Sequence, residues 1–337
     1  MPLNKKKKNL LKIIDNFSGK KIVVWGDYLL DEYIYGHTRR ISREAPVLIL
    51  SYKNSVFSLG GAGNSLLNLK SLGASPIPVG VLGTEKSGKE ALKIIENHGI
   101  PSKYLIKNPH YMTPSKTRIL AGEESTSKQQ ILRIDKESNV PDTKKIKDSL
   151  LNALIHSSQK ADALLISDYN YFTVKKDIYD EVLPRFKQAG IIVALDSRFR
   201  LLEFKNTTVS TPNENEAKKA LDLDIYDDIG SPEKAGEKLL EKIESDSILL
   251  TRGSKGMMLF QKGKKPYNID IFGTDEIVDV TGAGDTVISV LTLALSAGAE
   301  PKDAALIANY SAGLVVMKKG TAMVSIEELR EAIVSKN

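Results

Sequence analysis

The sequence predicts an α/β fold, with a mostly parallel central sheet between two layers of helices and a small antiparallel β lid. Short runs rich in β-branched residues alternate with amphipathic stretches along most of the 337 residues, which is typical of βαβ units. From Ala283 onward the pattern is helical throughout. Two stretches, 33–53 and 102–135, break the alternation with strand-like segments that no strong helix separates.

The strands of the main sheet are expected where short apolar runs are bounded by Gly, Asp or Ser. These runs are Lys21–Trp25, Ile77–Leu82, Ala163–Ser167, Ile191–Leu195 and Ser247–Thr251. The helices are expected between and after them, where the pattern is amphipathic. The helical stretches are Asn64–Leu72, Lys86–Asn97, Thr143–His156, Asp177–Gln188, Glu233–Glu241, Ala283–Ala297, Lys302–Lys318 and Ile326–Val334.

The two interrupting stretches predict the lid. Their strand-like segments are Tyr33–Gly36, Val47–Tyr52, Ser115–Leu120 and Gln129–Ile134. Such strands most simply form an antiparallel subdomain beside the carboxyl ends of the parallel strands, where it could cover a ligand. An edge extension of the main sheet is the alternative that the sequence leaves open. Paired lid edges would also allow a homodimer, whereas the many lysines and glutamates there could equally blunt those edges.

Composition excludes several classes of protein. The absence of cysteine rules out disulfides, thiolate metal sites and cysteine nucleophiles. The four histidines are scattered without metal-ligand spacing, which argues against a histidine zinc site. The longest apolar run, Val287 to Ala299, is about 13 residues and too short to span a bilayer. We therefore expect a single soluble domain over 1–337, in the cytoplasm and without a membrane partner.

Charge is unevenly distributed along the chain. The net charge is +6, and Lys5–Lys8 supply four of those positive charges. A lysine run at a terminus is most often a frayed, solvated segment, so residues 1–12 are expected to form a basic, flexible tail. No arginine-rich stripe with interleaved aromatic residues follows, which argues against a nucleic-acid partner. The apolar stretch after the lysines is interrupted by Lys12, Asp15 and Asn16, unlike a signal peptide.

Three glycine clusters are candidates for binding phosphate. Gly83–Glu90 comes within one residue of a Walker A loop, but Glu90 stands where a Ser or Thr hydroxyl should hold Mg²⁺. We interpret it as a turn from a strand into a helix. Gly60-Gly61-Ala-Gly63-Asn64 also precedes a helix and would let a ligand approach the backbone, although many tight turns look similar.

The third cluster, Asp279-Val-Thr-Gly282-Ala-Gly284-Asp285, is the most informative, because it leads directly into an apolar helix. Small residues at a helix start leave backbone N–H groups free to bind an anion such as a transferring phosphoryl group. An aspartate there would repel phosphate, but it would serve as a general base toward an attacking hydroxyl. The alternative is that Asp285 is only a favourable carboxylate at a helix N-terminus.

Together these residues resemble the PfkB-type, or ribokinase-like, carbohydrate kinase family. Residues 279–285 are similar to its C-terminal signature Asp-Thr-x-Gly-Ala-Gly-Asp, and residues 60–64 to its N-terminal one. Asn213-Glu-Asn-Glu216 carries the family's Asn-x-x-Glu motif, and Thr251-Arg-Gly253-Ser-Lys-Gly256 resembles its nucleotide-side turn. The resemblance covers essentially residues 20–335 and implies the ribokinase-like three-layer sandwich.

The resemblance also implies roles and cofactors. Asp285 would be the catalytic base, with an anion hole made by the N–H groups of Gly282, Ala283 and Gly284. ATP and Mg²⁺ are implied, and a monovalent cation such as K⁺ is compatible. The nucleotide side would comprise Asn213, Glu216, Thr251, Gly253, Gly256 and Asn309, of which Asn213 and Glu216 would organise Mg²⁺ through water. The sugar side would comprise Asp31, Gly60, Gly61, Asn64, Lys116 and Arg133.

Each of these roles has a simpler alternative. Asn213 and Glu216 could merely cap a helix, Asn309 could be an amide on a helix surface, and Lys116 and Arg133 could be surface charges of the lid.

A subgroup is indicated by further segments. Gly26-Asp-Tyr-Leu-Leu-Asp31 and Arg40–Val47 resemble the start of bacterial heptose-7-phosphate kinases, the kinase part of the bifunctional proteins of ADP-heptose synthesis for lipopolysaccharide. Lys116-Thr-Arg118 and Gln129–Asp135 are similar too. The implied reaction phosphorylates the anomeric hydroxyl of heptose 7-phosphate. No His-x-Gly-His adenylyltransferase segment follows, so nucleotidylation is expected to need a separate enzyme.

The sequence departs from this subgroup in two places. After Ser167-Asp-Tyr169 the subgroup's Lys-Gly element is replaced by Asn170-Tyr-Phe172, and its Asp-Pro-Lys is Asp196-Ser-Arg198. Arginine does not simply replace lysine. A kinase for fructose, ribose or a nucleoside therefore stays open, as does a non-catalytic sugar- or nucleotide-binding regulator on the same fold.

Overall fold

The computed structural model describes residues 5–122, 128–222, 232–273, 278–318 and 320–335. In this part of the chain, the main sheet runs in the order β13 (Tyr267–Ile269), β12 (Met257–Gln261), β11 (Ser247–Thr251), β10 (Val209–Ser210), β9 (Ile192–Ser197), β8 (Ala163–Asp168), β1 (Lys21–Gly26), β4 (Ser75–Gly83) and β5 (Leu105–Asn108). Its strands are parallel except at the β11–β12 and β12–β13 pairings. All five predicted strands lie in it, whereas the antiparallel edge formed by β12 and β13 was not predicted.

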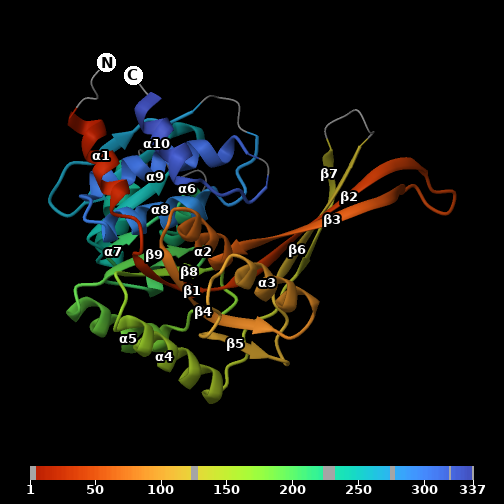
Figure 1. Cartoon of the computed structure of the whole chain (residues 1–337), viewed down its shortest axis with the longest axis horizontal. Helices are drawn as coiled ribbons and strands as arrows, with labels where there is room; N and C mark the ends of the chain where they lie inside the picture. Colours follow the sequence, from red (N-terminus) through yellow and green to blue (C-terminus); the bar gives the residue numbers. More distant parts are fainter. Residues whose placement is uncertain (1–4, 123–127, 223–231, 274–277, 319, 336–337) are drawn as a thin grey trace.

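Helices cover both faces of this sheet (Figure 1). Alternate residues of a strand point to opposite faces, so Ile22 and Val24 join one buried cluster while Val23 and Trp25 join the other. The first cluster is completed by α1 (Lys5–Asp15), α2 (Ala62–Ser71), α3 (Lys86–Asn97), α8 (Ala283–Ser296), α9 (Pro301–Val316) and α10 (Ile326–Ser335). The second is completed by α4 (Lys144–Ser158), α5 (Lys176–Gln188), α6 (Glu214–Ala220) and α7 (Pro232–Ile243). The predicted three layers are confirmed.

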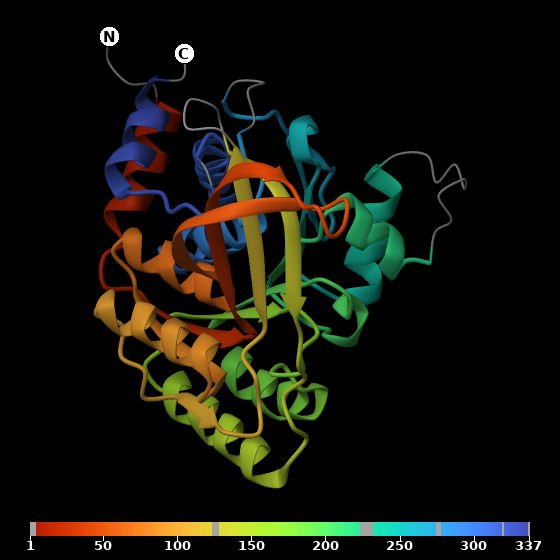
Figure 2. The same ribbon diagram turned by 90° about the vertical axis from the view of Figure 1, so that its right-hand side faces the viewer.

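A second, four-stranded sheet projects from the body as the lid (Figures 1 and 2). Its order is β3 (Leu48–Gly61), β2 (Tyr28–Ile41), β6 (Ser115–Gly122) and β7 (Gln129–Lys136). The lid strands are longer than predicted, and β5 belongs to the main sheet. The hairpins β2–β3 and β6–β7 are antiparallel, but β2 and β6 pair in parallel, because both run outward from the body. Residues 123–127 of the predicted lid lie outside the described part.

The expected flexible tail is wrong for residues 5–12, which form most of helix α1. Leu10, Ile13 and Ile14 are buried at helical spacing, and the helix packs beside α10 near the chain ends (Figure 1). Burying this apolar stripe offsets the loss of chain entropy that would otherwise favour fraying. The lysine run is the solvent face of a packed helix. Residues 1–4 lie outside the described part.

Helix α8 explains the longest apolar run of the chain. Eleven consecutive residues, Asp285 to Leu295, are buried in it, and it lies against α2 and α9 in the core. In the described part of the chain, no helix combines the length and apolar character that crossing a membrane requires. The run is thus a core helix, and its buried start carries Asp285.

Candidate active site

Asp285 lies where the carboxyl ends of the parallel strands meet the start of α8. Its side chain is 3% exposed. Carboxylate atom Oδ2 accepts a hydrogen bond from Asn64 Nδ2 at 3.0 Å, and Oδ1 accepts one from the Tyr169 hydroxyl at 2.9 Å. Burial raises the pKa of Asp285 to about 6, although both hydrogen bonds act to lower it. A carboxylate held at two atoms, with a pKa near 6, is suited to accept a proton at neutral pH.

The glycine loop before Asp285 separates two cavities. Gly282 has φ 78° and starts α8 from the left-handed region that glycine adopts without strain. Gly282 and Asp285 line a cavity of about 220 Å³, here called the inner cavity. Ala283 and Gly284 line another of about 280 Å³, here called the α9 cavity. A group bound in one cavity can therefore meet a group bound in the other across a single helix start.

The α9 cavity gathers most of the residues predicted for the nucleotide side. It is lined by Asn213, Thr251, Gly253, Gly256 and Asn309, together with apolar side chains that include Met257, Ile271 and Val287. Asn309 is 4% exposed, and its Nδ2 donates to the Asp270 carbonyl at 2.9 Å. Its amide is therefore held inside the protein and is not on a helix surface. The Ala283 N–H, part of the predicted anion hole, donates to the Val280 carbonyl at 3.2 Å.

Glu216 is absent from this lining because it caps α6. The Glu216 N–H donates to Asn213 Oδ1 and the Asn213 N–H donates to Glu216 Oε2, both at 2.9 Å, which is a reciprocal capping box. Burial raises the pKa of Glu216 and of neighbouring Asp196, and the charge of Glu216 adds to the rise at Asp196. The helix-cap alternative is thus present, and it leaves two neighbouring, half-buried carboxyl groups.

Those two carboxyl groups fit a hydrated divalent cation. Mg²⁺ keeps several waters and typically takes only one or two carboxylates plus substrate phosphates. Within the described residues, no three His, Cys, Asp or Glu side chains form a group that could hold a metal ion. A cation near Asp196 and Glu216 would therefore depend on water and phosphate oxygens for most of its ligands.

The inner cavity contains most of the residues predicted for the sugar side. Asp31, Gly60, Gly61, Lys116 and Arg133 all line it with Asp285. A Cβ on Gly60 would lie 2.7 Å from Asp31 Oδ2, so only glycine lets the backbone approach this carboxylate. Gly61 has φ 57°, and a Cβ there would lie 2.6 Å from Leu29.

Asn64 does not line the cavity. Its Nδ2 donates to Asp285 and its Oδ1 accepts from Asn68 Nδ2 at 3.1 Å, so the geometry assigns it to holding the carboxylate.

Arg118 belongs to the Lys116-Thr-Arg118 segment that resembles the subgroup, but it was not predicted as a site residue. It forms an ion pair with Asp31 inside the inner cavity, and both side chains are mostly buried. In the β2–β6 register, Lys116 lies opposite Asp31, and a residue two positions along a strand shares its face. The period-two spacing of Lys116 and Arg118 was therefore a signal that sequence reasoning could have used.

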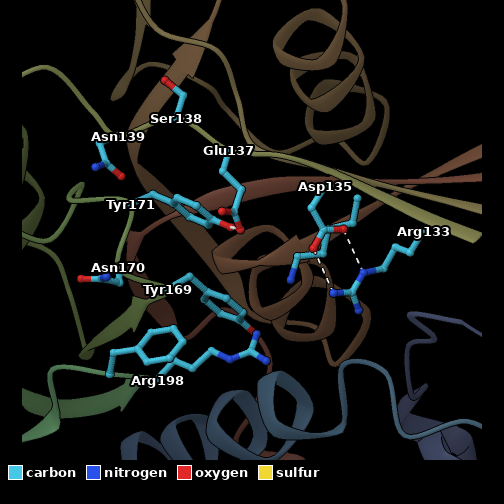
Figure 3. Close-up of a pocket in the computed structure, with 11 residues that line it drawn as sticks. Arg133, Asp135, Glu137, Ser138, Asn139, Tyr169, Asn170, Tyr171 and Arg198 are labelled. Carbon is cyan, nitrogen blue, oxygen red and sulfur yellow. Dashed lines mark hydrogen bonds and ion pairs between the residues drawn. The ribbon is translucent and has the colours of Figure 1, made fainter.

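A larger cavity of about 650 Å³, here called the outer cavity, opens beside the inner one (Figure 3). Lys116, Arg133, Tyr169 and Arg198 line both cavities. The Arg198 guanidinium lies 5.8 Å from the Tyr169 ring centroid. Burial, followed by the nearby charge of Arg198, lowers the pKa of Lys116. Positive charge thus gathers where the two cavities meet, with Arg133 also paired to Asp135 at 2.9 Å.

Asn170 and Tyr171 of the Asn170-Tyr-Phe172 segment line the outer cavity, and the segment forms a tight loop. Asn170 and Phe172 have φ 67° and 64°, the region that glycine adopts without strain. The Tyr171 hydroxyl donates to Glu137 Oε1 at 2.9 Å. The lysine missing from this segment therefore leaves Lys116, Arg133 and Arg198 as the basic residues lining the described cavity.

The near match to a Walker A loop is a helix start, as predicted. Glu85 precedes α3, and its Oε1 accepts hydrogen bonds from the Gly88 N–H at 3.0 Å and from the Thr113 N–H at 2.9 Å. A Cβ on Gly88 would lie 2.1 Å from the Gly83 carbonyl oxygen. The Glu85 side chain and the close approach of the Gly88 backbone to Gly83 therefore hold this turn as the start of α3.

The fold and site define a class: an α/β enzyme with a β lid, in which a buried carboxylate and a glycine-rich helix start lie between two ligand cavities. A family model described as pfkB family carbohydrate kinase matches residues 20–328, and the chain belongs to this family. It is a carbohydrate kinase. The predicted family and the ribokinase-like fold are confirmed.

Within the family, the chain is similar to curated bifunctional proteins named HldE. The bifunctional protein HldE of Desulfatibacillum aliphaticivorans is 37% identical over 319 residues, a match that covers 93% of this chain and 63% of that protein. The HldE of Geobacter sulfurreducens is 35% identical over 327 residues, covering 96% of this chain and 65% of that protein. The chain therefore spans less than two thirds of the length of these relatives.

Solved structures share the fold at low sequence identity. Arabidopsis thaliana ribokinase complexed with ribose and ATP superposes with a TM-score of 0.70 and 21% identity, covering 95% of this chain and all of that one. Escherichia coli phosphofructokinase-2 in complex with fructose-6-phosphate gives a TM-score of 0.71 and 16% identity, covering 94% and 98%. These likenesses show the fold.

Proposed function

We propose that this protein is an ATP-dependent kinase that transfers the γ-phosphoryl group to the anomeric hydroxyl of heptose 7-phosphate. The product would be heptose 1,7-bisphosphate, used in the cytoplasm for ADP-heptose and lipopolysaccharide synthesis. One observation carries the proposal: Asp285 lines an inner cavity together with Lys116, Arg133 and Arg198, and the glycine loop before it adjoins the α9 cavity. The identity to HldE proteins supports the choice of sugar.

The chemistry follows from the position of each group. The sugar would occupy the inner cavity with its reacting hydroxyl at Asp285. Asp285 takes the proton as the oxygen attacks the γ-phosphorus, and the bond from that phosphorus to the β–γ bridging oxygen breaks to release ADP. The N–H groups of Gly282 and Gly284 would stabilise the charge that develops on the transferred group. The Ala283 N–H would join them only by leaving the Val280 carbonyl. Closure of the lid over the inner cavity would exclude water, which limits transfer to water and strengthens these electrostatic interactions.

The basic wall favours a sugar that carries its own phosphate. Lys116, Arg133 and Arg198 line the junction of the inner and outer cavities, where they would bind a phosphate of the sugar that extends into the outer cavity. Arginine can bind a phosphate through two parallel N–H groups. Because Arg133 is already paired with Asp135, a bound phosphate would mainly add neutralising charge at Lys116 and Arg198. Heptose 7-phosphate has its phosphate at the end of the molecule opposite the anomeric hydroxyl, so the phosphate would occupy the outer cavity when that hydroxyl is at Asp285.

ATP and Mg²⁺ would be held on the other side of the glycine loop. Asn213, Thr251, Gly253, Gly256 and Asn309 would line the nucleotide site. The Asn213–Glu216 cap and Asp196 would orient waters around Mg²⁺, which when bound would offset charge on the nucleotide phosphates. A monovalent cation such as K⁺ belongs to the same proposal, and an E. coli phosphofructokinase-2 structure with potassium shares the fold. Turnover in K⁺ against Na⁺ buffers tests it.

The first experiment measures ADP release with Mg-ATP and a panel of sugars. Heptose 7-phosphate is compared with unphosphorylated heptose, mannose, fructose and ribose, and each assay is repeated with Asp285→Asn. We expect turnover with heptose 7-phosphate alone, falling by about 10²–10⁴-fold in the variant. Turnover with another sugar would instead indicate a kinase for that sugar. No turnover with any sugar would favour a non-catalytic regulator. Normal turnover of Asp285→Asn would contradict the proposed role of Asp285 as the base.

We also propose a homodimer formed through the lid. Large apolar side chains are exposed on the lid strands β2, β3 and β7, among them Ile41 at 65% and Tyr52 at 67%. Apolar surface of this kind, on strands with open edges, is a common site of association between copies of a chain. A second copy of the lid would cover these residues and pair the sheet edges.

A further inference from the structure

Asp27 has a fully buried carboxylate that the proposed mechanism does not use, and hydrogen bonds connect it to Asp285 through Tyr169. Asp27 follows directly after β1 and is 0% exposed. Its Oδ2 accepts hydrogen bonds from the backbone N–H groups of Tyr169 at 2.8 Å and Tyr171 at 3.1 Å. Its Oδ1 accepts one from the Thr173 N–H at 3.1 Å. Three alternate N–H groups of one loop therefore converge on a single side chain.

The backbone of that loop is shaped to hold an anion. Asn170 and Phe172, at φ 67° and 64°, alternate with residues outside the left-handed region. Such alternation turns successive N–H groups toward one side and makes a concave anion-binding nest. Left-handed conformation is unfavourable for phenylalanine, so the loop needs a partner to hold it. That partner is Asp27.

Asp27 contacts the segments that carry both hydrogen-bond donors of Asp285, Tyr169 and Asn64. The Asp27 carboxylate accepts the Tyr169 N–H, and the Tyr169 hydroxyl donates to Asp285 Oδ1. Through its carbonyl oxygen, Asp27 accepts the Ala62 N–H at 3.0 Å, at the first residue of α2, which carries Asn64. Asn64 in turn donates to Asp285 Oδ2. One buried residue thus connects the two hydrogen-bond donors of the catalytic carboxylate.

We infer that Asp27 is a positioning residue, which holds the 169–173 loop so that the Tyr169 hydroxyl stays on Asp285 and keeps that carboxylate ionised and oriented. This inference rests on the proposed role of Asp285. The other charged or titratable groups that interact with the Asp285 carboxylate are Asp31, Asp196, Arg198 and the hydroxyl of Tyr169. Asp31, Arg198 and Asp196 are retained in every variant below.

The test compares Asp27→Asn, Tyr169→Phe and the double variant. An amide at position 27 turns its NH₂ group toward N–H donors, so the loop is expected to move. Loss of a hydrogen bond to a carboxylate raises the pKa of that carboxylate by about one unit. We expect the acid limb of the kcat–pH profile to move upward by about one pH unit in each single variant, and no further in the double variant. Removing the charge of Asp27 alone would act in the opposite direction.

A second readout separates this inference from the proposed function. The Asp285 carboxyl signal in ¹³C-aspartate-labelled protein, assigned by its loss in Asp285→Asn, reports its titration without turnover. The same upward shift in Asp27→Asn and Tyr169→Phe supports the inference whether or not a sugar is phosphorylated. Failure of Asp285→Asn to lower turnover would count against the proposed function alone.

The matched control is Glu85→Ala, which removes a carboxylate that also accepts backbone N–H groups, but at the start of α3. Glu85 Oε1 accepts from the Gly88 and Thr113 N–H groups, so its loss is expected to lower thermal stability without moving the acid limb. Asp27→Ser is the second variant if Asp27→Asn does not fold. Failure of both to fold, an unmoved titration of Asp285, or additive shifts in the double variant would each overturn the inference.

Discussion

At the residue scale, Asp285 combines burial with a charge that its proposed role as a base requires. A buried carboxyl is harder to ionise, and burial raises the pKa of Asp285 to about 6 from its ordinary value of 3.8. The folded state therefore binds a proton at a pH where the unfolded chain has released it. This stabilisation is fully present below pH 3.8 and is lost as pH rises through 6. At neutral pH the ionised Asp285 carboxylate therefore lowers the stability of the fold.

Asp285→Asn is therefore expected to be more stable than the wild type at pH 8. The gain should shrink toward pH 4.5, because the wild-type carboxyl is then protonated and uncharged. Each unit of raised pKa corresponds to about 1.4 kcal/mol. Differential scanning calorimetry of both proteins across this pH range measures the difference. An unchanged gain at both pH values would contradict the raised pKa.

The Asp31–Arg118 pair is the other residue-scale determinant. Asp31 and Arg118 side chains are 6% and 13% exposed, so removing one partner leaves a nearly buried charge alone. Arg118→Gln is expected to lower the free energy of unfolding by about 3–5 kcal/mol. Arg133→Gln is the control, because its pair with Asp135 is 49% exposed on the arginine side and should contribute at most about 1 kcal/mol. Urea unfolding distinguishes them, and equal losses would refute the argument.

At the scale of elements, the buried stripe of α1 decides how the basic N-terminal segment behaves. Leu10, Ile13 and Ile14 face the core while Lys5, Lys6 and Lys8 face solvent. Asp15 and Arg330 form an ion pair that also joins α1 to α10. An element with so many lysines is ordered because its apolar side is covered, and its helix propensity is a smaller factor.

Leu10→Ala tests that view. Leu10 is 2% exposed, and truncating a buried leucine lowers the free energy of unfolding by about 2–5 kcal/mol. Lys8→Ala, on the exposed side of the same helix, should change it by less than about 0.5 kcal/mol. Chemical denaturation measures both. A frayed tail would make the two substitutions equally harmless.

At the scale of the whole molecule, the lid and body make one site from distant segments. β2 continues from β1 after a single residue, and β6 pairs with it in parallel, so Asp31 and Lys116 are carried to the same place. Asp285 reaches it from a helix more than 160 residues further along the chain. The lid strands β2 and β3, by contrast, leave large apolar side chains such as Ile41 and Tyr52 exposed.

Association through the lid predicts a dimer that one exposed residue can disrupt. Tyr52→Asp should shift the mass measured by light scattering from dimer to monomer, because a charge would be buried in the apolar contact. Gln159→Asp adds the same charge at an exposed site on the body and should leave the dimer intact. A wild-type protein that stays monomeric at high concentration would refute the proposed dimer.

The sequence predicted the local elements well, because their signals are local. α3 and β11 begin and end where the periodicity placed them, and the glycine loop at Gly282 leads into a helix as its small residues predicted. Asp285 and the α9 cavity lining were likewise predicted from motifs. The edge strands β12 and β13 were missed, as was the packing of α1, since both depend on which surface is available to cover them.

The sequence by itself determined the fold class, the family and the glycine loop with its aspartate, because periodicity and short motifs are written in consecutive residues. Only the tertiary structure decided that Asn64 and Tyr169 hold Asp285, that Arg118 neutralises Asp31 and that Asp27 organises the loop at 169–173. These contacts join residues far apart in the chain, and hydrogen bonds and ion pairs depend on distance and burial. Neither quantity exists until the strands and helices pack.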